Sequence, residues 1–231
     1  MESKAMNEPF SLGPRLSLCA GLLRRGQPVA DIGTDHGYLP IWLIKTGAAP
    51  RAIACDINPG PLAAARKHAE MYGVELKLVL SNGLSALSPE DAEDIVIAGM
   101  GGELILHIID SAPWLKRADK HIVLQPMSAV DKLRTGLWEM GFNVQKELAA
   151  VENGKVYSAF SVRYQGDMGE MNDIYPYMGR LTPGTAEVSA YADKTLRGLR
   201  NSLLGAEHRG NKEGSAHLRA VIEGIEREYL Q

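Results

Sequence analysis

An acidic residue and two glycines follow a short apolar run early in the chain, in the sequence Asp31-Ile-Gly33-Thr-Asp-His-Gly37. The apolar residues 29–32 are typical of a buried parallel strand, and apolar residues at helical spacing begin after Gly37. A strand, a glycine turn and a helix in this order present backbone N–H groups and a helix N-terminus to a ligand. The pattern departs from the glycine fingerprint of dinucleotide-binding proteins, and the acid favours a cationic or amine-bearing nucleoside.

Polar residues also follow the next two predicted strands. Asp56 ends the strand 51–56, where its carboxylate could accept hydrogen bonds from both ribose hydroxyls of a nucleoside or, alternatively, interact with a helix N-terminus. Asn82 follows the strand 75–80, where its amide could bond the edge of an adenine ring or form a turn with Gly83. The three strand ends together suit S-adenosylmethionine, a nucleoside with an amino-acid tail that carries a methyl group on a sulfonium.

A further glycine-rich segment, Gly99-Met-Gly-Gly102, follows the predicted strand 94–98 and indicates close approach of a ligand to the backbone. Enzymes that methylate an exocyclic amine usually carry Asn or Asp, two prolines and an aromatic residue at this position, and this chain does not. Methylation at carbon 5 needs a catalytic cysteine, but Cys19 falls in a predicted helix and Cys55 inside a predicted strand.

Attack by a ring nitrogen remains compatible with these residues. Adenine N1 has a free lone pair and needs positioning, together with an acceptor for the N6 proton, whose acidity rises on methylation. Asp35, His36 and Tyr38 are candidates for the acceptor by their position in the first glycine turn, and they are not ranked by the sequence.

The 231 residues carry a net charge of −3, and 45% of them are hydrophobic, as in a globular chain of one large domain or one domain with an appendage. This charge balance indicates no general affinity for nucleic acid, although a local patch could still bind one. The first residues lack the order of a signal peptide, and no apolar run of about 18 residues exists. We therefore expect a cytoplasmic protein that does not enter a membrane. With two cysteines and no cluster at ligand spacing, we expect no metal.

The hydrophobic pattern predicts five strand–helix units followed by two strands. These last two are separated by Glu152-Asn-Gly154, and Asn-Gly is the strongest short signal for a hairpin. Right-handed crossovers then produce a doubly wound, mostly parallel sheet with helices on both faces, which is an α/β fold. The strands are expected at 29–32, 51–56, 75–80, 94–98, 120–125, 142–150 and 156–164, and the first helix at 11–25.

The rest of the chain has a different pattern. Residues 165–182 are rich in Gly, Asp, Met, Asn and Pro, which predicts a connecting loop. Apolar residues then step by three and four in two stretches, which predicts an antiparallel helical hairpin. We therefore divide the chain into a main domain, 1–164, and a linker with a helical hairpin, 165–231. The basic side chains Arg15, Lys194, Arg197 and Arg200 are either solvated or contact a phosphate backbone.

Three motifs resemble the bacterial tRNA adenine-N1 methyltransferases that act at tRNA position 22: residues 31–40 (DIGTDHGYLP), 97–102 (IAGMGG) and 124–127 (LQPM). The resemblance covers the whole main domain, and the helical hairpin matches the family's C-terminal appendage in kind. It implies a Rossmann-like class I methyltransferase fold with a seven-stranded sheet. It also implies S-adenosylmethionine as the cofactor, and methylation of N1 of an adenine in tRNA.

The resemblance implies roles for individual residues as well. Gly99, Met100, Gly101 and Gln125 are expected to border the target base. We add Gln125 to the candidate catalytic residues and the four basic residues above to the candidate tRNA contacts. The residues expected to bind the cofactor are Asp31, Gly33, Thr34, His36, Gly37, Asp56, Ile57, Asn82, Gly83, Gly99 and Met100.

Two alternatives stay open from the sequence. One is a methyltransferase that acts on a small molecule or a protein, in which case the hairpin binds no RNA. The other is a protein that binds S-adenosylmethionine without catalysis and uses the hairpin as an interface. A monomer is favoured over an oligomer.

Overall fold

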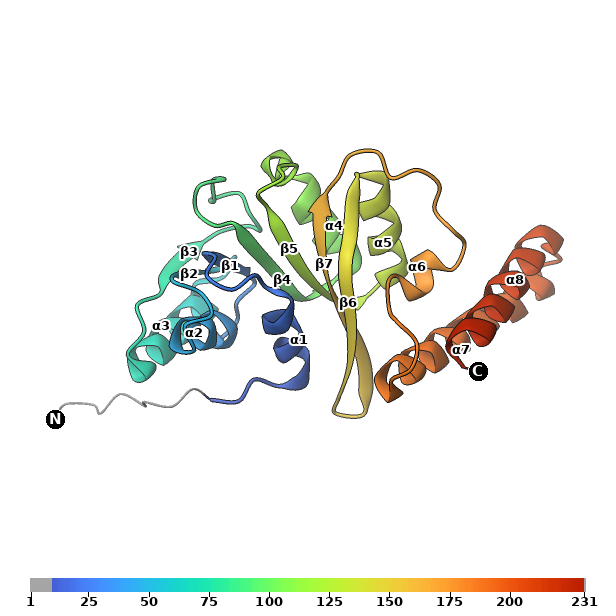
Figure 1. The fold of residues 1–231 in the computed structure, drawn as a ribbon, viewed down its shortest axis with the longest axis horizontal. Helices are drawn as coiled ribbons and strands as arrows, with labels where there is room; N and C mark the ends of the chain where they lie inside the picture. The colour runs from blue at the N-terminus through green and yellow to red at the C-terminus, as the bar shows by residue number, and fades with distance from the viewer. Residues whose placement is uncertain (1–9, 231) are drawn as a thin grey trace.

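Seven strands form one sheet in the computed structural model, which describes residues 10–230, in the order β3-β2-β1-β4-β5-β7-β6 (Figure 1). Strands β1 to β5 are parallel, and β7 lies antiparallel between β5 and β6. The predicted doubly wound sheet with a closing antiparallel hairpin is confirmed. The residues inspected for a signal peptide lie outside the described part of the chain. The strands are β1 (Val29–Ile32), β2 (Ala52–Asp56), β3 (Lys77–Leu80), β4 (Asp94–Gly101), β5 (His121–Ser128), β6 (Phe142–Glu152) and β7 (Lys155–Tyr164).

Helices cover both faces of the sheet because the buried strands are apolar on both sides. Within β1, Val29 packs with the core beneath α1 and α2, whereas Ala30 and Ile32 pack with the core beneath α4 and α5. This alternation is what a two-fold side-chain period produces in a doubly covered sheet. The helices of this domain are α1 (Pro14–Leu22), α2 (Tyr38–Lys45), α3 (Pro59–Tyr72), α4 (Gly102–Asp110), a short 3-10 turn η1 (Pro113–Leu115) and α5 (Val130–Glu139).

Helix α1 is shorter than the 11–25 expected. It begins after the extended Gly13, with Pro14 in its first turn, and ends before Leu23, which is also extended. Proline suits the first turn of a helix because its missing N–H needs no partner there. The sequence pattern overestimated the helix because Leu12 and Leu23, which lie outside it, pack in the same core as its apolar residues.

The β6–β7 hairpin turns where it was expected. Asn153 and Gly154 both have positive φ, 50° and 72°, as the tight turn that joins two twisted strands requires. The pairing runs from Phe142↔Tyr164 to Glu152↔Lys155, with one register shift between Val144 and Lys146.

The C-terminal helices α7 (Ala186–His208) and α8 (Lys212–Tyr229) form the predicted antiparallel pair, an arm that extends from the β6–β7 side of the sheet (Figure 1). Their core is separate from those of the sheet and includes Val156 of β7. Thr185 and Asn211 cap the two helices through their side-chain oxygens.

The expectation of a connecting loop over 165–182 was wrong in one place. A single helical turn, α6 (Tyr175–Met178), lies within it, and both of its end residues are buried. Tyr175 packs edge-to-face against Trp138 of α5, with 4.9 Å between ring centroids. Tertiary burial, rather than helix propensity, therefore orders this segment.

Candidate active site

The predicted site residues reach one edge of the sheet because the parallel strands are almost in register. Ile32 pairs with Cys55 and with Ile97, so the next residues along, Gly33, Asp56 and Ala98, lie side by side. Asp56 pairs with Leu80, and Ala98 pairs with Gln125. The ends of all five parallel strands thus lie along a single row, where open α/β sheets bind their ligands.

The first glycine turn is shaped by close contacts. Gly33 has φ +75°, and a Cβ there would overlap the methyl group of Met100. Gly37 has φ +73°, and a Cβ there would lie 2.9 Å from that of Ala65 on α3. The amides of Gly33 and Thr34 both donate to the Cys55 carbonyl. A side chain is therefore disfavoured at both glycines, by the positive φ and by the neighbouring Met100 or Ala65 side chain.

Asp31 is a buried carboxylate that faces this turn. Its Oδ2 accepts a 2.7 Å hydrogen bond from the Thr34 hydroxyl, and its Oδ1 has no donor within residues 10–230. Burial raises the pKa of Asp31 from 3.8 to about 6, although the Thr34 hydrogen bond acts against the rise. A cation placed beside Oδ1 would stabilise the ionised form, so the site suits an ammonium group.

A cavity of about 370 Å³ opens next to Asp31. Of the three candidate proton acceptors, Asp35 and Tyr38 line it. His36 instead packs against His68, with 5.7 Å between ring centroids, and its Nε2 lies 3.5 Å from Asp35. The other residues that line the cavity are Arg15, Leu16, Asp31, Gly33, Thr34, Leu39, Ala98 and Gly99.

Beyond Gly33, the row continues over β2 and β3. Asp56 accepts a 2.8 Å hydrogen bond from the Asn58 amide, which leaves its other oxygen for a ligand. Ile57 and Leu80 are 60% and 59% exposed, so two apolar side chains face solvent where a nucleobase could cover them. Asn82 is exposed at the same edge.

Gly83 has a structural reason for being glycine. A Cβ there would lie 3.0 Å from Ile108 of α4, and its φ of +57° also disfavours a side chain. Gly83 is therefore the residue that the turn requires. The exposed Asn82 side chain is not explained by the turn and lies at the edge of the row.

The opposite wall of the cavity is held by a network that the sequence did not reveal. The Arg15 Nη1 donates a 2.7 Å hydrogen bond to Oε1 of Gln125, which also accepts from the Gly99 amide at 3.2 Å. Glu152 of β6 binds the Arg15 side chain at 3.1 Å. Gln125 is fully buried. Gly101 ends β4 nearby, paired with Ser128.

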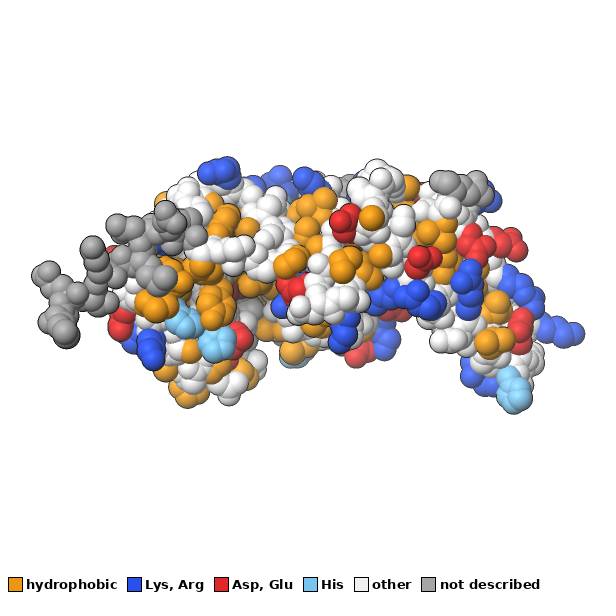
Figure 2. Space-filling model, turned by 90° about the horizontal axis from the view of Figure 1, so that it is seen from below, with side chains coloured by type: hydrophobic (Ala, Val, Ile, Leu, Met, Phe, Trp, Pro, Cys, Tyr) orange, Lys and Arg blue, Asp and Glu red, His pale blue; other side chains and the backbone are white. Residues whose placement is uncertain are grey.

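The three basic candidates on α7 are not equivalent. Lys194 donates to the Val156 carbonyl and, with Arg197, lines a second cavity beside the β6–β7 hairpin. Arg200 instead forms a 2.5 Å ion pair with Glu226 of α8. Figure 2 shows basic and acidic side chains interspersed over the arm, at the right of the view. Lys194 and Arg197 are therefore better placed near the sheet than Arg200.

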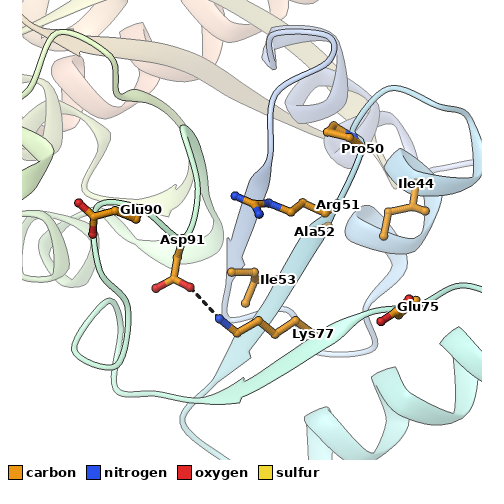
Figure 3. A pocket seen from close by; sticks show the side chains of 9 residues that line it. All are labelled: Ile44, Pro50, Arg51, Ala52, Ile53, Glu75, Lys77, Glu90 and Asp91. Carbon is orange, nitrogen blue, oxygen red and sulfur yellow. Dashed lines mark hydrogen bonds and ion pairs between the residues drawn. The ribbon is translucent and has the colours of Figure 1, made fainter.

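A further cavity, of about 400 Å³, lies at the opposite edge of the sheet (Figure 3). Lys77 and Asp91 point toward each other across it and form a 2.7 Å ion pair. The hydrogen bond from Lys77 lowers the pKa of Asp91 to about 2. This cavity lies at the amino ends of β2 and β3, away from the row, and its charged pair is already satisfied.

Other chemistries find no support in residues 10–230. Burial raises the pKa of both Cys19 and Cys55 to about 12, so neither thiol is a ready nucleophile. In that range no three His, Cys, Asp or Glu side chains are arranged to hold a metal ion. None of the described helices has the length and apolarity needed to cross a membrane.

The fold and the strand-end row define a class of protein. Residues 12–160 match the family model described as a methyltransferase domain. The chain therefore belongs to the methyltransferase-domain family, and the predicted Rossmann-like methyltransferase fold is confirmed.

Within that class, the chain is similar to tRNA (adenine(22)-N(1))-methyltransferase from Bacillus subtilis (strain 168). The two are 33% identical over 154 residues, which span 66% of this chain and 64% of the relative, just under two thirds of its length. The crystal structure of the B. subtilis M1A22 tRNA methyltransferase TrmK superposes with a TM-score of 0.79 at 25% identity, over 94% of this chain and 98% of that one. A Streptococcus pneumoniae protein solved in complex with S-adenosyl-L-methionine gives 0.77 at 30% identity, over 90% and 98%. The resemblance found in the sequence is confirmed.

Proposed function

We propose that this protein transfers a methyl group from S-adenosylmethionine to N1 of an adenine in tRNA, at position 22. The observation that carries the proposal is the row of strand ends, with the buried Asp31 near the end of β1 and Asp56 at the end of β2. The likeness to the B. subtilis enzyme supports tRNA as the substrate and position 22 as the target.

The residues of the row fit the cofactor. The free oxygen of Asp31 would accept the ammonium group of its amino-acid tail, and the free oxygen of Asp56 would accept its ribose hydroxyls. Ile57 and Leu80 would cover the adenine ring, and Asn82 would reach its polar edge. Gly33 lines the cavity beside Asp31, in the turn between these groups.

When bound, the cofactor supplies an electrophilic methyl group, and the residues of this chain supply positioning. Orientation of the two reactants can account for about 7–11 kcal/mol of a transfer barrier. Asp35 and Tyr38 line the cavity in which we place the target adenine, so they are the best placed to accept the N6 proton. His36 does not line that cavity but contacts both of these residues, with its Nε2 3.5 Å from Asp35 and 5.7 Å between its ring centroid and that of Tyr38.

The tRNA must present an unstacked base to this cavity. Extruding an adenine from a stack costs a few kcal/mol, which contacts outside the cavity must offset. We assign Lys194 and Arg197 to such contacts because they line the cavity beside the β6–β7 hairpin. Arg15 lines the active-site cavity itself, where Glu152 and Gln125 hold its guanidinium. Within this proposal, residues 1–164 carry the chemistry, and residues 165–231 hold the substrate.

A single-turnover assay with methyl-labelled cofactor and bulk tRNA, followed by nucleoside analysis, tests the proposal. We expect label in N1-methyladenosine. Label in another nucleoside or in a protein would replace the proposal with a different methyltransferase activity. Cofactor binding without any transfer would make the chain a binding protein.

Replacement of Asp56 by alanine tests the cofactor site separately. Because the charged acceptor for two hydroxyls is lost, we expect cofactor affinity to fall at least about 100-fold, by roughly 3 kcal/mol, as measured by calorimetry. Cooperative thermal unfolding should persist, since Asp56 lies at the end of its strand. Unchanged affinity would remove Asp56 from the site.

A further inference from the structure

The end of strand β6 reaches the first turn of helix α1 through one side chain. The two carboxylate oxygens of Glu152 accept hydrogen bonds from the backbone amide of Arg15 at 3.3 Å and from its Nε at 3.1 Å. A Cβ at Gly13 would lie 2.7 Å from Glu152 Oε1. A side chain at that position would displace the Glu152 carboxylate, so glycine there permits the contact as it stands.

Arg15 transmits this contact to the cavity. With its Nε held by Glu152, its Nη1 points at Oε1 of Gln125, 2.7 Å away. A guanidinium is planar, so fixing one side of it fixes the direction of the other. The guanidinium also lies 5.9 Å from the centre of the Tyr157 ring, which limits its alternative orientations.

Gln125 passes the constraint to the backbone that lines the cavity. Its Oε1 accepts from both Arg15 and the amide of Gly99, and its Nε2 donates to the Pro126 carbonyl at 2.9 Å. Both ends of the carboxamide thus have hydrogen-bond partners. If the carboxamide were turned the other way, its NH2 group would face the Arg15 and Gly99 donors. Gly99, at φ +78°, lines the cavity together with Ala98, its neighbour in β4, and lies beside Arg15.

We propose that Glu152 is a positioning residue for methyl transfer: through Arg15 it fixes the Gln125 carboxamide and the Gly99 backbone, and so sets the wall against which the target base is held. This inference rests on the proposed function. It gives Gln125 the role of an orienting group rather than a group that contacts the base. It also makes the β6–β7 hairpin, to which the arm is attached, part of the reaction geometry.

The decisive variant is Glu152→Gln, which keeps the shape of the side chain and removes its charge. A displacement of about 1 Å in a reactive geometry can cost about 100-fold in rate, so we expect the single-turnover rate at saturating cofactor and tRNA to fall about 10- to 100-fold. The dissociation constants of cofactor and tRNA should stay within about twofold of the wild type.

Asp91→Asn is the matched control. Asp91 has the same side-chain exposure as Glu152, 21%, and also pairs with a cation, but at the far edge of the sheet. It should leave the transfer rate unchanged. A loss of rate in this control equal to that of Glu152→Gln, or a wild-type rate in Glu152→Gln, would overturn the proposal.

The charge-swapped variant R15E/E152R separates positioning from simple ion pairing. It keeps two opposite charges at these positions but removes the donor to Gln125, so thermal unfolding should stay close to that of the wild type while the transfer rate stays low. Recovery of the rate would show that only the pair matters and would contradict the role given to Gln125.

A readout without catalysis keeps this inference separate from the proposed function. The Gly99 amide hydrogen is protected by Gln125, so we expect it to exchange faster in Glu152→Gln than in the wild type or in Asp91→Asn. A wild type that methylates no RNA would refute the proposed function alone. Equal Gly99 exchange in all three proteins would refute the positioning role alone.

Discussion

Strand β6 carries two glutamates that each pair with an arginine from a helix, yet the two pairs lie in very different surroundings. Glu147 binds Arg134 of α5 at 2.6 Å, and both side chains are completely buried. Glu152 binds Arg15 of α1 at 3.1 Å, and the side chains are 21% and 23% exposed. Because side chains alternate along a strand, the two glutamates point to opposite faces of the sheet.

The buried pair holds the fold together. Arg134 donates to the carbonyls of Pro176 and Tyr177 and to the Tyr191 hydroxyl, so one guanidinium joins α5, α6 and α7. Burial alone would lower the pKa of Arg134, but the charge of Glu147 and the hydrogen bonds outweigh it and raise the pKa. The partly exposed pair instead holds Arg15, a residue that lines the cavity, so that it donates to the buried Gln125. The same two residue types therefore serve the fold when fully buried and can serve the site when water reaches them.

The largest effect is expected from Arg134→Met. This change leaves the Glu147 carboxylate buried without a cation, which costs about 3–5 kcal/mol of unfolding free energy, measurable by urea titration. The double variant R134M/E147L should lose less than the single one, because it leaves no buried charge. A loss below about 1 kcal/mol in the single variant would show that the pair is not what joins the arm to the sheet.

Asp31 sharpens the comparison because it is a buried carboxylate without a cation. Its folded pKa, about 6, lies above the ordinary 3.8, so the folded chain favours the protonated form. Its stabilising contribution is complete below pH 4 and is lost as the pH rises through about 6, by up to about 3 kcal/mol. Urea titrations between pH 4 and 7.5 measure this. The unfolding free energy of the wild type should fall as the pH rises, and that of Asp31→Asn should lack this component of the fall.

Cofactor affinity should follow the opposite course, because an ammonium group binds the ionised carboxylate. We expect the dissociation constant to fall as the pH rises to about 6 and then to level off. Asp31→Asn should show weak binding at every pH. A pH-independent affinity in the wild type would mean that Asp31 does not face the ligand's charge.

Glu152→Gln should change stability little, by less than about 1 kcal/mol, because partly exposed pairs gain little over hydration. The same urea titration, repeated at high salt, should narrow even this difference. A loss of unfolding free energy as large as that of Arg134→Met would contradict the distinction between the two pairs, since the partly exposed pair would then also hold the fold together.

The smallest effect is expected for the exposed pair between α7 and α8. Arg200 and Glu226 are 53% and 41% exposed, so Arg200→Ala should cost no more than about 0.5 kcal/mol. Thermal unfolding of the variant beside the wild type measures this. A larger loss would indicate that the arm depends on its surface charges rather than on its apolar seam.

The strand–turn–helix units were predictable because they are local. Apolar runs followed by glycine, and the Asn153-Gly154 turn, need only short-range sterics. The gathering of Asp31, Asp56 and Asn82 at one edge was predictable too, because the carboxyl ends of parallel strands meet there whatever the side chains do. The roles of these residues stay predictions until the assays above are made.

What the residues by themselves determined was thus the order of the elements and the edge at which the polar strand ends meet. Only the tertiary structure decided which side chains touch: Arg15 meets Glu152 across 137 positions of the chain, α6 forms because Tyr175 is buried, and His36 turns toward His68 rather than into the cavity. Such contacts depend on how helices pack on the sheet, and no local pattern encodes the partner of a charge that far away.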